Sequence, residues 1–287
     1  MQKIILLNSN DKTFEDMRTS IPEIPIEHFS IREVAVHIPA GKEPVFIREN
    51  QAIDFTDAYV FSRFHIIDPG FTGILHEYLH TKNIPFANLI NTTFDEASDK
   101  IAQMPRLALA GIPIPETFIV RAEAYVSNAD YIHENIAFPV ICKTNGRKGS
   151  EVHLIQSVNE LKTYIAALPD KTRFLIQEYI ENTFDVRVIV AFGEALGAIK
   201  RTSENSFLNN LSQGGSALAH DLTEEERTLA IKATAVTHLD IGGVDIIHKD
   251  GVPIILEVNR SPGVLGFESV HDGEKVFSKV AKLIKQK

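Results

Sequence analysis

The stretch that decides the fold lies near the end of the chain, at residues 242–263, and reads GGVDIIHKDGVPIILEVNRSPG. Asp250 and Gly251 form an Asp-Gly pair, which is typical of the tight turn between two antiparallel strands. Apolar runs flank this pair, and their spacing predicts strands at residues 243–248 and 253–259. Strands this apolar are expected to be buried, so the stretch predicts a β-hairpin in the core of an α/β domain.

Three polar side chains interrupt the apolar hairpin. With Gly251 at the centre of the turn, Asp245 and Glu257 stand opposite each other, with Cβ atoms roughly 5 Å apart. Asn259 follows Glu257 by two residues and therefore lies on the same face. Two carboxylates and an amide oxygen suit Mg²⁺. The alternative is an acidic, solvated hairpin face, but the apolar flanks favour buried carboxylates, which need a partner.

Patterns of apolar residues predict alternating strands and helices before the hairpin. Strands are expected at residues 3–7, 58–61, 117–120, 138–143, 151–155, 174–179, 185–192 and 194–201. Helices are expected at residues 93–110, 157–168 and 223–239, and a lysine-rich helix closes the chain. Gly111 is a natural stop for the first helix, and Thr223 with Glu226 forms a capping box at the third. Two successive α/β units follow from this order, with hairpins in the second.

A lysine and a glycine-rich loop follow the predicted strand at residues 138–143. Lys143 ends the strand, and Gly146, Lys148 and Gly149 come after it. Backbone N–H groups of such a loop can surround a phosphate, and a lysine can neutralise its charge. The loop is not a Walker loop, because no Gly-Lys-Ser/Thr follows at the required spacing. An ordinary hairpin turn with surface lysines is the alternative that the turn residues alone favour.

Composition narrows the class of protein. The 287 residues, 44% of them hydrophobic, can bury the core of one large unit or of several smaller ones. With 29 basic against 38 acidic residues the net charge is −9, which argues against nucleic acid as a partner. The amino terminus carries too short an apolar run for a signal peptide or a membrane span, and the single cysteine, Cys142, cannot form an internal disulfide. We therefore expect a cytoplasmic protein without membrane attachment.

Several blocks of sequence, taken in order, resemble the RimK-type ATP-grasp carboxylate-amine ligases, which are alpha-L-glutamate ligase-like proteins. The resemblance runs from about Thr93 to Glu268. The blocks are Asp99-Lys100, GIPIPETF at 111–118, FPVICK at 138–143 with its glycine loop, QEYI at 177–180, Asp185-Val-Arg187, AIKRTS at 198–203, NNLSQGGSA at 209–217, GVDII at 243–247 and ILEVNRSPG at 255–263. Any one block could arise by chance, but the ordered set is specific.

The resemblance implies an ATP-grasp fold of the mixed α/β (α+β) class. A pre-ATP-grasp α/β domain would occupy residues 1–92, and the ATP-grasp domain residues 93–287, with a lid subdomain at about 113–175 and a metal-binding subdomain at about 176–287. It also implies ATP and Mg²⁺ (or Mn²⁺) as cofactors. The implied reaction joins a carboxylate to an amine through an acyl phosphate, with an amino acid such as glutamate as one substrate.

The resemblance also assigns nucleotide contacts to matching residues of this chain. It implies that Lys100 and Lys143 contact the phosphates of ATP and that Asp185 contacts the ribose. The adenine would lie at a hinge of three consecutive residues, Glu178, Tyr179 and Ile180. A loop at residues 206–215 would cover the reaction centre and contribute two asparagines, Asn209 and Asn210.

Metal ligands and catalytic groups are implied in the same way. The Mg²⁺ ligands would be Asp245, Glu257 and Asn259. Three arginines would orient the substrate carboxylate and the acyl phosphate, since a guanidinium pairs with such oxygens bidentately: Arg187, Arg201 and Arg260.

The chain departs from the family pattern at three positions. Glu151 stands where the glycine loop of the family usually carries another glycine, and Leu208 replaces an arginine of the glutamate-adding relatives. Arg260 stands where those relatives have a small residue, and it can compensate for Leu208. These differences indicate that the substrate differs from that of the relatives.

The sequence leaves the acceptor and the oligomeric state open. The carboxylate donor and the amine acceptor can be an amino acid, a peptide or a protein tail, and the resemblance implies a homo-oligomer. Two other functions stay as alternatives. One is an ATP-grasp module that binds ATP without catalysis; the other is a zinc metallopeptidase, because His76 to His80 reads HEYLH and matches the HExxH pattern.

Overall fold

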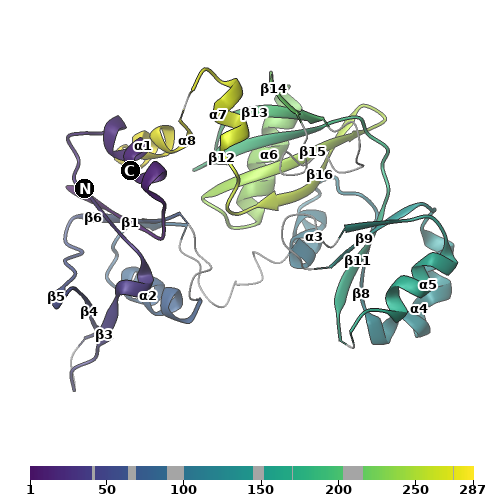
Figure 1. The fold of residues 1–287 in the computed structure, drawn as a ribbon, viewed down its shortest axis with the longest axis horizontal. Helices are drawn as coiled ribbons and strands as arrows, with labels where there is room; N and C mark the ends of the chain where they lie inside the picture. Colours follow the sequence, from purple (N-terminus) through teal and green to yellow (C-terminus); the bar gives the residue numbers. More distant parts are fainter. Residues whose placement is uncertain are drawn as a thin grey trace. The chain divides into compact units, whose positions relative to one another are not determined.

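The computed structural model describes residues 1–40, 43–63, 69–88, 100–144, 152–169, 171–202, 216–273 and 275–287 (Figure 1). The chain forms two compact units. The first joins Met1–Glu96 to His271–Lys287, and the second is Ala97–Val270. The closing segment, predicted as part of the ATP-grasp domain, therefore has its contacts in the first unit.

The first unit is built on a parallel sheet with the strand order β2-β1-β6-β7. Its strands are β1 (Lys3–Leu7), β2 (Ile26–Phe29), β6 (Ala58–Ser62) and β7 (Phe86–Ala87). The other elements are α1 (Asp11–Ser20), α2 (Pro69–Thr81), α8 (Val276–Lys285), the 3-10 helix η1 (Ile31–Glu33) and a small sheet of β3 (Ala35–His37), β4 (Val45–Arg48) and β5 (Gln51–Ala52). All of β6 is buried, as expected for a central strand of a parallel sheet.

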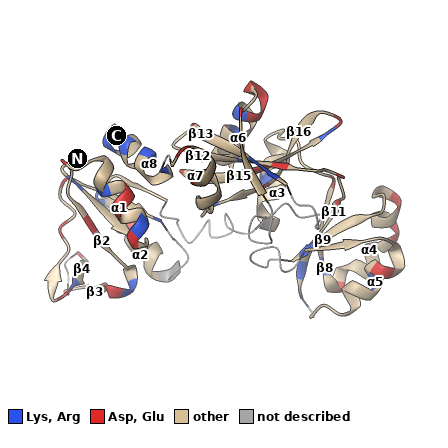
Figure 2. Cartoon of the chain, turned by 45° about the horizontal axis from the view of Figure 1, so that its top comes forward, with Lys and Arg blue, Asp and Glu red and all other residues tan. Residues whose placement is uncertain are grey.

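Helix α8 explains why the end of the chain belongs to the first unit. Its apolar stripe is buried and consists of Val276, Phe277, Val280, Ala281 and Ile284. The ring of Phe277 lies 6.5 Å from the ring of Phe61 between centroids, and Ser278 Oγ donates a 2.8 Å hydrogen bond to the Asp16 carbonyl in α1. Lysines stand on the exposed side of the helix, blue at α8 in Figure 2, in agreement with the predicted lysine-rich helix.

The second unit starts with α3 (Lys100–Leu109), followed by an antiparallel sheet of order β10-β9-β11-β8. The strands are β8 (Thr117–Arg121), β9 (Val140–Thr144), β10 (Val152–Ile155) and β11 (Arg173–Glu178). Helices α4 (Ala122–Asn135) and α5 (Val158–Ala166) complete a core that includes Val140, Cys142, Phe174 and Ile176. Because side chains alternate along a strand, Lys143 and Gln177 point to the opposite face of this sheet.

A second antiparallel sheet of the same unit has the order β14-β13-β12-β15-β16. Its strands are β12 (Asp185–Ala191), β13 (Glu194–Thr202), β14 (Ser216–His220), β15 (Ile241–Lys249) and β16 (Val252–Asn259). Helices α3 and α6 (Glu224–Val236) pack on one face, around a core that includes Val186, Val188, Val244, Ile246 and Ile255. Helix α7 (Leu265–Val270) contacts β13 and β14.

Local signals in the sequence set several of these boundaries. Gly111 has a φ of +68° just after α3. The predicted capping box of Thr223 and Glu226 is present at the start of α6, whose first turn is acidic (red in Figure 2). Gly193, between the predicted strands at residues 185–192 and 194–201, has a φ of +82°, as a tight turn requires. Residues 93–99, predicted as the beginning of the helix that contains α3, lie outside the described residues. None of the described helices is long and apolar enough to cross a membrane.

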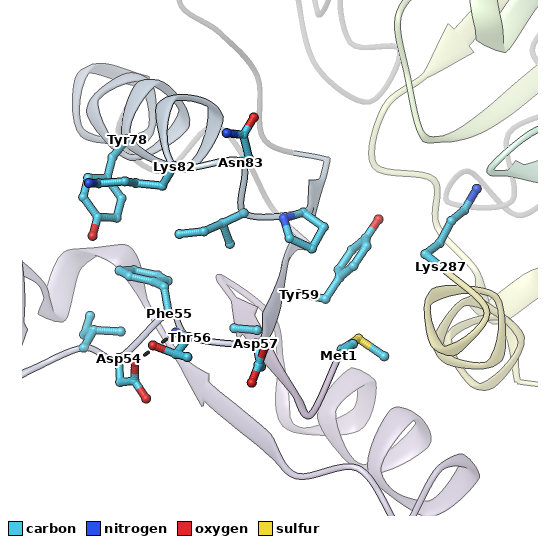
Figure 3. A pocket seen from close by; sticks show the side chains of 14 residues that line it. Met1, Asp54, Phe55, Thr56, Asp57, Tyr59, Tyr78, Lys82, Asn83 and Lys287 are labelled. Carbon is cyan, nitrogen blue, oxygen red and sulfur yellow. Dashed lines mark hydrogen bonds between the residues drawn. The ribbon is translucent and has the colours of Figure 1, made fainter.

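A hollow opens in the first unit at the amino ends of β1, β6 and β7 (Figure 3). Met1, Tyr59, Tyr78, Lys82 and Lys287 are among the side chains around it. None of the residues predicted for the functional site lines it. Ligands of open α/β sheets generally bind at the carboxyl ends of the strands, so this hollow lies at the opposite edge.

Candidate active site

The predicted hairpin of β15 and β16 is present and turns through two residues. Asp250 and Gly251 have φ values of +52° and +82°, the left-handed conformation that a tight hairpin turn requires. Lys249 pairs with Val252 directly beside the turn. The prediction placed the centre of the turn on Gly251, whereas it lies between the two turn residues.

A shift of register places the two acidic residues of the hairpin opposite each other. The two-residue turn pairs Ile246 with Ile255, a register that on its own would place Asp245 opposite Leu256. The register shifts between Asp245 and Ile246, so that Asp245 pairs with Glu257. Such a bulge adds one residue to one strand and moves the residues after it to the other face. The facing pair of Asp245 and Glu257 is therefore confirmed, although a bulge that the sequence did not reveal produces it.

Asp245 is the centre of a charged network on this face. The residue is 4% exposed, and its carboxylate accepts two hydrogen bonds from Arg187, each 2.7 Å long. Arg201 reaches the same carboxylate from β13, with 3.1 Å between Nη2 and Oδ1. Asn259 Nδ2 donates a 3.2 Å hydrogen bond to Asp245 Oδ2. The structure thus gathers a second predicted metal ligand, Asn259, and two predicted catalytic arginines around the carboxylate of Asp245.

Arg201 is held by a second carboxylate. Its Nε and Nη2 donate to the two oxygens of Asp185 at 2.5 and 2.8 Å, and both residues are buried. Cross-strand register explains the contact, because Asp185 pairs directly with Arg201 and Arg187 pairs directly with Asp245. Asp185, predicted to contact the ribose, is thus engaged with Arg201.

Burial and charge set the ionisation of this network. Burial alone would raise the pKa of Asp245, but Arg187 and Arg201 outweigh it and hold that pKa well below its usual range. Burial and the nearby Asp245 raise the pKa of Asp185, against the opposing effect of Arg201. For Arg201, burial favours a lower pKa, but the two carboxylates raise it. The arrangement keeps Asp245 ionised and Arg201 charged.

Gly243 and Arg260 frame the end of the hairpin. Gly243 pairs with Asn259, and a Cβ atom added to Gly243 would come within 2.6 Å of Pro262 Cβ. Only glycine lets the Ser261-Pro262 segment approach the sheet this closely. Arg260, the third predicted catalytic arginine, is buried with 5% exposure directly after β16.

Lys143 and Gln177 share a face of the other sheet in this unit. Lys143 Nζ donates a 2.7 Å hydrogen bond to Gln177 Oε1. Gln177 is 1% exposed, and its Nε2 donates to Thr117 Oγ1 at 3.0 Å and lies 3.8 Å from Met104 Sδ. Gln177 was not among the predicted site residues. A polar residue within the apolar run of β11 was the available signal.

The predicted hinge follows β11. Glu178 forms an ion pair with Lys249, accepts a 3.4 Å hydrogen bond from the Glu116 N–H and donates its own N–H to the Glu116 carbonyl at 2.9 Å. Ile180 is 9% exposed and packs with Ile247 and Ile254, whereas Tyr179 is half-buried. The hinge backbone is thereby tied to the segment before β8, and the side chains of Glu178 and Ile180 contact the hairpin. Lys249 is a contact that the sequence did not predict.

Some predicted site residues lie outside the described residues. These are Asn209 and Asn210 with the rest of the predicted covering loop, Leu208, Glu151 and the glycine loop after Lys143. Lys100 is the first residue of α3, and the structure describes its backbone but not its side chain.

The HExxH match and the cysteine have local environments of their own. His76 and His80 stack with 6.2 Å between ring centroids in α2, and His76 also contacts the ring of Phe86. Over the described part of the chain, these histidines and the other His, Cys, Asp and Glu side chains form no group of three that could hold a metal ion. Cys142 is fully buried in the core of its sheet, and burial raises its pKa to about 12.

The fold is that of the ATP-grasp proteins. The structure is similar over 99% of this chain to the ATP-grasp ligase PsnB complexed with minimal precursor, Mg and ADP, of which it covers 96%, with a TM-score of 0.74. The two sequences are 16% identical, so this likeness establishes the fold.

Sequence comparison identifies the family within that class. The model of the RimK-like ATP-grasp domain matches residues 97–284, and the chain belongs to this family. It is 32% identical over 220 residues to a probable alpha-L-glutamate ligase of Nitrosococcus oceani. The matched residues are 75% of this chain and 71% of that protein. It is 34% identical over 195 residues to the ribosomal protein bS6–L-glutamate ligase of Escherichia coli O81, covering 66% of this chain and 64% of that one.

Proposed function

We propose that this chain is an ATP-dependent ligase that joins a carboxylate to an amine through an acyl phosphate. The observation that carries the proposal is the pairing of Asp245 with Glu257 beside Arg187 and Arg201 on one sheet face. Oxygen ligands for a cation and donors for phosphate or carboxylate oxygens thus stand side by side. Phosphoryl transfer to a carboxylate needs both, because both reactants are negatively charged.

The donor set fits Mg²⁺. Asp245, Glu257 and Asn259 offer two carboxylates and an amide oxygen from two paired strands, and hard oxygen ligands of this kind bind Mg²⁺ together with nucleotide phosphates. Asn259 would supply the third ligand through its amide oxygen. When bound there, Mg²⁺ would neutralise charge on the phosphates of ATP.

The nucleotide would lie between the lysine and the hairpin. Lys143 and Lys100 would contact its phosphates, and the adenine would lie at Glu178, Tyr179 and Ile180. Gln177 supports this assignment by fixing Lys143 Nζ with a 2.7 Å hydrogen bond. Asn209 and Asn210 would act from the covering loop, where exclusion of water protects an acyl phosphate from hydrolysis.

The arginines would act on the two chemical steps. In the first, a carboxylate oxygen of the substrate attacks the γ-phosphorus and the bond to ADP breaks. In the second, the amine nitrogen attacks the carbonyl carbon, phosphate leaves and the nitrogen loses a proton. Arg201, oriented by Asp185, and Arg187 and Arg260 would donate to the oxygens that gain charge.

Glutamate is the amino-acid substrate that we propose, because both relatives described above carry glutamate ligase in their names. The second substrate would be an amino acid, a peptide or a protein tail. Leu208 and Arg260 distinguish this chain from glutamate-adding relatives, and we propose that they alter the choice of this second substrate.

The test is ADP release from ATP and Mg²⁺ in the presence of amino-acid, peptide and protein-tail pools. Wild type is compared with Glu257→Gln, and a chelator serves as the control. We expect substrate-dependent ADP release that the variant and the chelator both abolish. ATP binding without turnover in every pool would instead favour a non-catalytic module, and zinc in the purified protein would reopen His76 and His80.

A further inference from the structure

Among the described residues, the outer edge of strand β16 is covered by a side chain and a backbone carbonyl rather than by another strand. β16 ends the strand order of its sheet, with β15 as its neighbour on one side. On the other side, the Ile255 N–H donates a 2.9 Å hydrogen bond to the Pro113 carbonyl. Further along the same edge, Gln103 of α3 contacts Val258.

Gln103 binds both backbone polar groups of Val258. Its Nε2 donates to the Val258 carbonyl at 2.8 Å, and its Oε1 accepts from the Val258 N–H at 3.1 Å. Gln103 is 1% exposed and Val258 is 2% exposed. The side-chain amide thus replaces the peptide group of a missing neighbouring strand, where a buried backbone group without a partner would be costly.

Val258 lies between Glu257 and Asn259, directly after the bulge of β16. A bulge disrupts the ladder and bends the strand, so the residues that follow it need another constraint to hold one orientation. Gln103 supplies that constraint from the outer edge. Because side chains alternate, fixing the Val258 peptide groups fixes the direction in which Glu257 and Asn259 leave the strand.

We propose that Gln103 is a positioning residue for the cation-binding residues Glu257 and Asn259. The inference rests on the proposed function, in which these side chains hold Mg²⁺. Outer groups that orient metal ligands commonly change metal affinity about 10–100-fold when they are removed. Helix α3 also carries Met104, whose sulfur lies 3.8 Å from Gln177 Nε2, so neighbouring residues of one helix contact both sheets of the site.

The test measures Mn²⁺ binding to the full chain in the presence of a non-hydrolysable ATP analogue, by electron paramagnetic resonance of free Mn²⁺. Gln103→Met keeps the size of the side chain but removes both hydrogen bonds. We expect its Kd for Mn²⁺ to rise about 10-fold or more. Its Kd for the analogue in a chelator should stay near the wild-type value, a separation that a general loss of structure would not give.

Thr237→Val is the matched control. Thr237 is fully buried in the same unit, and its hydroxyl donates to the Ala233 carbonyl at 2.9 Å, a contact within α6 and its C-cap. The Kd of Thr237→Val for Mn²⁺ should remain within about 2-fold of the wild-type value, as for substitutions at independent sites. Gln103→Glu keeps an acceptor for the Val258 N–H but loses the donor, so it should fall between wild type and Gln103→Met.

Three outcomes decide the inference. Wild-type Mn²⁺ affinity in folded Gln103→Met, together with weak binding by Glu257→Gln, would overturn the positioning role and leave the proposed function intact. Equal Mn²⁺ binding by wild type and Glu257→Gln would overturn both. If Gln103→Met does not fold, Gln103→Glu decides: weakened Mn²⁺ binding supports the inference, and wild-type binding rejects it.

Discussion

Two neighbouring residues of β15, Asp245 and Ile246, point to opposite faces of the five-stranded sheet. Ile246 is fully buried in the core against α3 and α6, whereas Asp245 faces the other way, toward Arg187 and Arg201. Apolar burial stabilises the fold, but burying ion pairs carries a desolvation cost that their attraction only partly offsets. The same strand therefore supplies stability on one face and chemistry on the other, and adjacent substitutions should separate the two.

The largest expected effect is on the polar face. Asp245→Asn removes a proposed metal ligand and the charge that Arg187 and Arg201 share while keeping the shape of the side chain. We expect its turnover to fall about 1000-fold, because the transition state would lose several kcal/mol of charge stabilisation. Steady-state ADP release by the folded variant measures this, and turnover within about 10-fold of wild type would remove Asp245 from the reaction.

Ile246→Ala tests the apolar face one residue away. Truncating a fully buried isoleucine should lower the free energy of unfolding by about 2–5 kcal/mol. Urea unfolding followed by circular dichroism measures that change. Turnover per folded molecule should stay close to wild type, and a loss comparable with that of Asp245→Asn would show that the two faces are not separable.

The sheet of β8 to β11 extends the comparison, because Cys142 and Ile176 lie in its core while Lys143 and Gln177 face the other way. Gln177→Leu removes the hydrogen bond to Lys143 Nζ. Since a hydrogen bond to a charged group contributes about 1.5–3 kcal/mol, the KM for ATP should rise roughly 10-fold or more. Gln177→Glu retains an acceptor for Lys143 and should recover much of the loss; equal KM values for both variants would argue against this contact.

Local signals were enough to predict the hairpin and its facing carboxylates, because Asp250-Gly251 marks the turn and the flanks are apolar. The register that brings these two acidic residues opposite each other was not predictable. A bulge has no signature in composition. The observed turn is centred between Asp250 and Gly251 rather than on Gly251, and the bulge compensates for this difference, so that Asp245 still pairs with Glu257. Agreement at this pair therefore reflects two local features that cancel.

Contacts between elements distant in sequence were beyond local patterns. The apolar stripe of α8 predicted a helix, but no periodicity could show that Phe277 packs near Phe61. Gln103 and Val258 are far apart along the chain, and their hydrogen bonds depend on how α3 meets the edge of β16. Polar residues in apolar runs were the signal for Gln103 and Gln177, without indicating their partners.

The smallest expected effect concerns a carboxylate near the apolar face. Glu226 of α6 is 1% exposed, accepts hydrogen bonds from the Thr223 N–H at 2.9 Å and contacts His220 of β14 at 3.0 Å. Burial opposes ionisation of Glu226, but these partners lower its pKa. A lowered folded pKa stabilises the fold above the unfolded pKa of about 4.3, and this contribution disappears as the pH falls through the folded value.

Glu226→Gln should therefore lower the free energy of unfolding at pH 7 by about 0.3–1 kcal/mol, the range for a charge at a helix amino terminus. The difference from wild type should shrink below a pH of about 4.3, where the wild-type carboxylate becomes protonated. Urea unfolding at several pH values measures both quantities. Glu225→Gln is the control, since Glu225 is an exposed acid in the same first turn, and it should show a smaller change. A Glu226→Gln deficit that stays constant with pH would assign the effect to shape and hydrogen bonding rather than to charge.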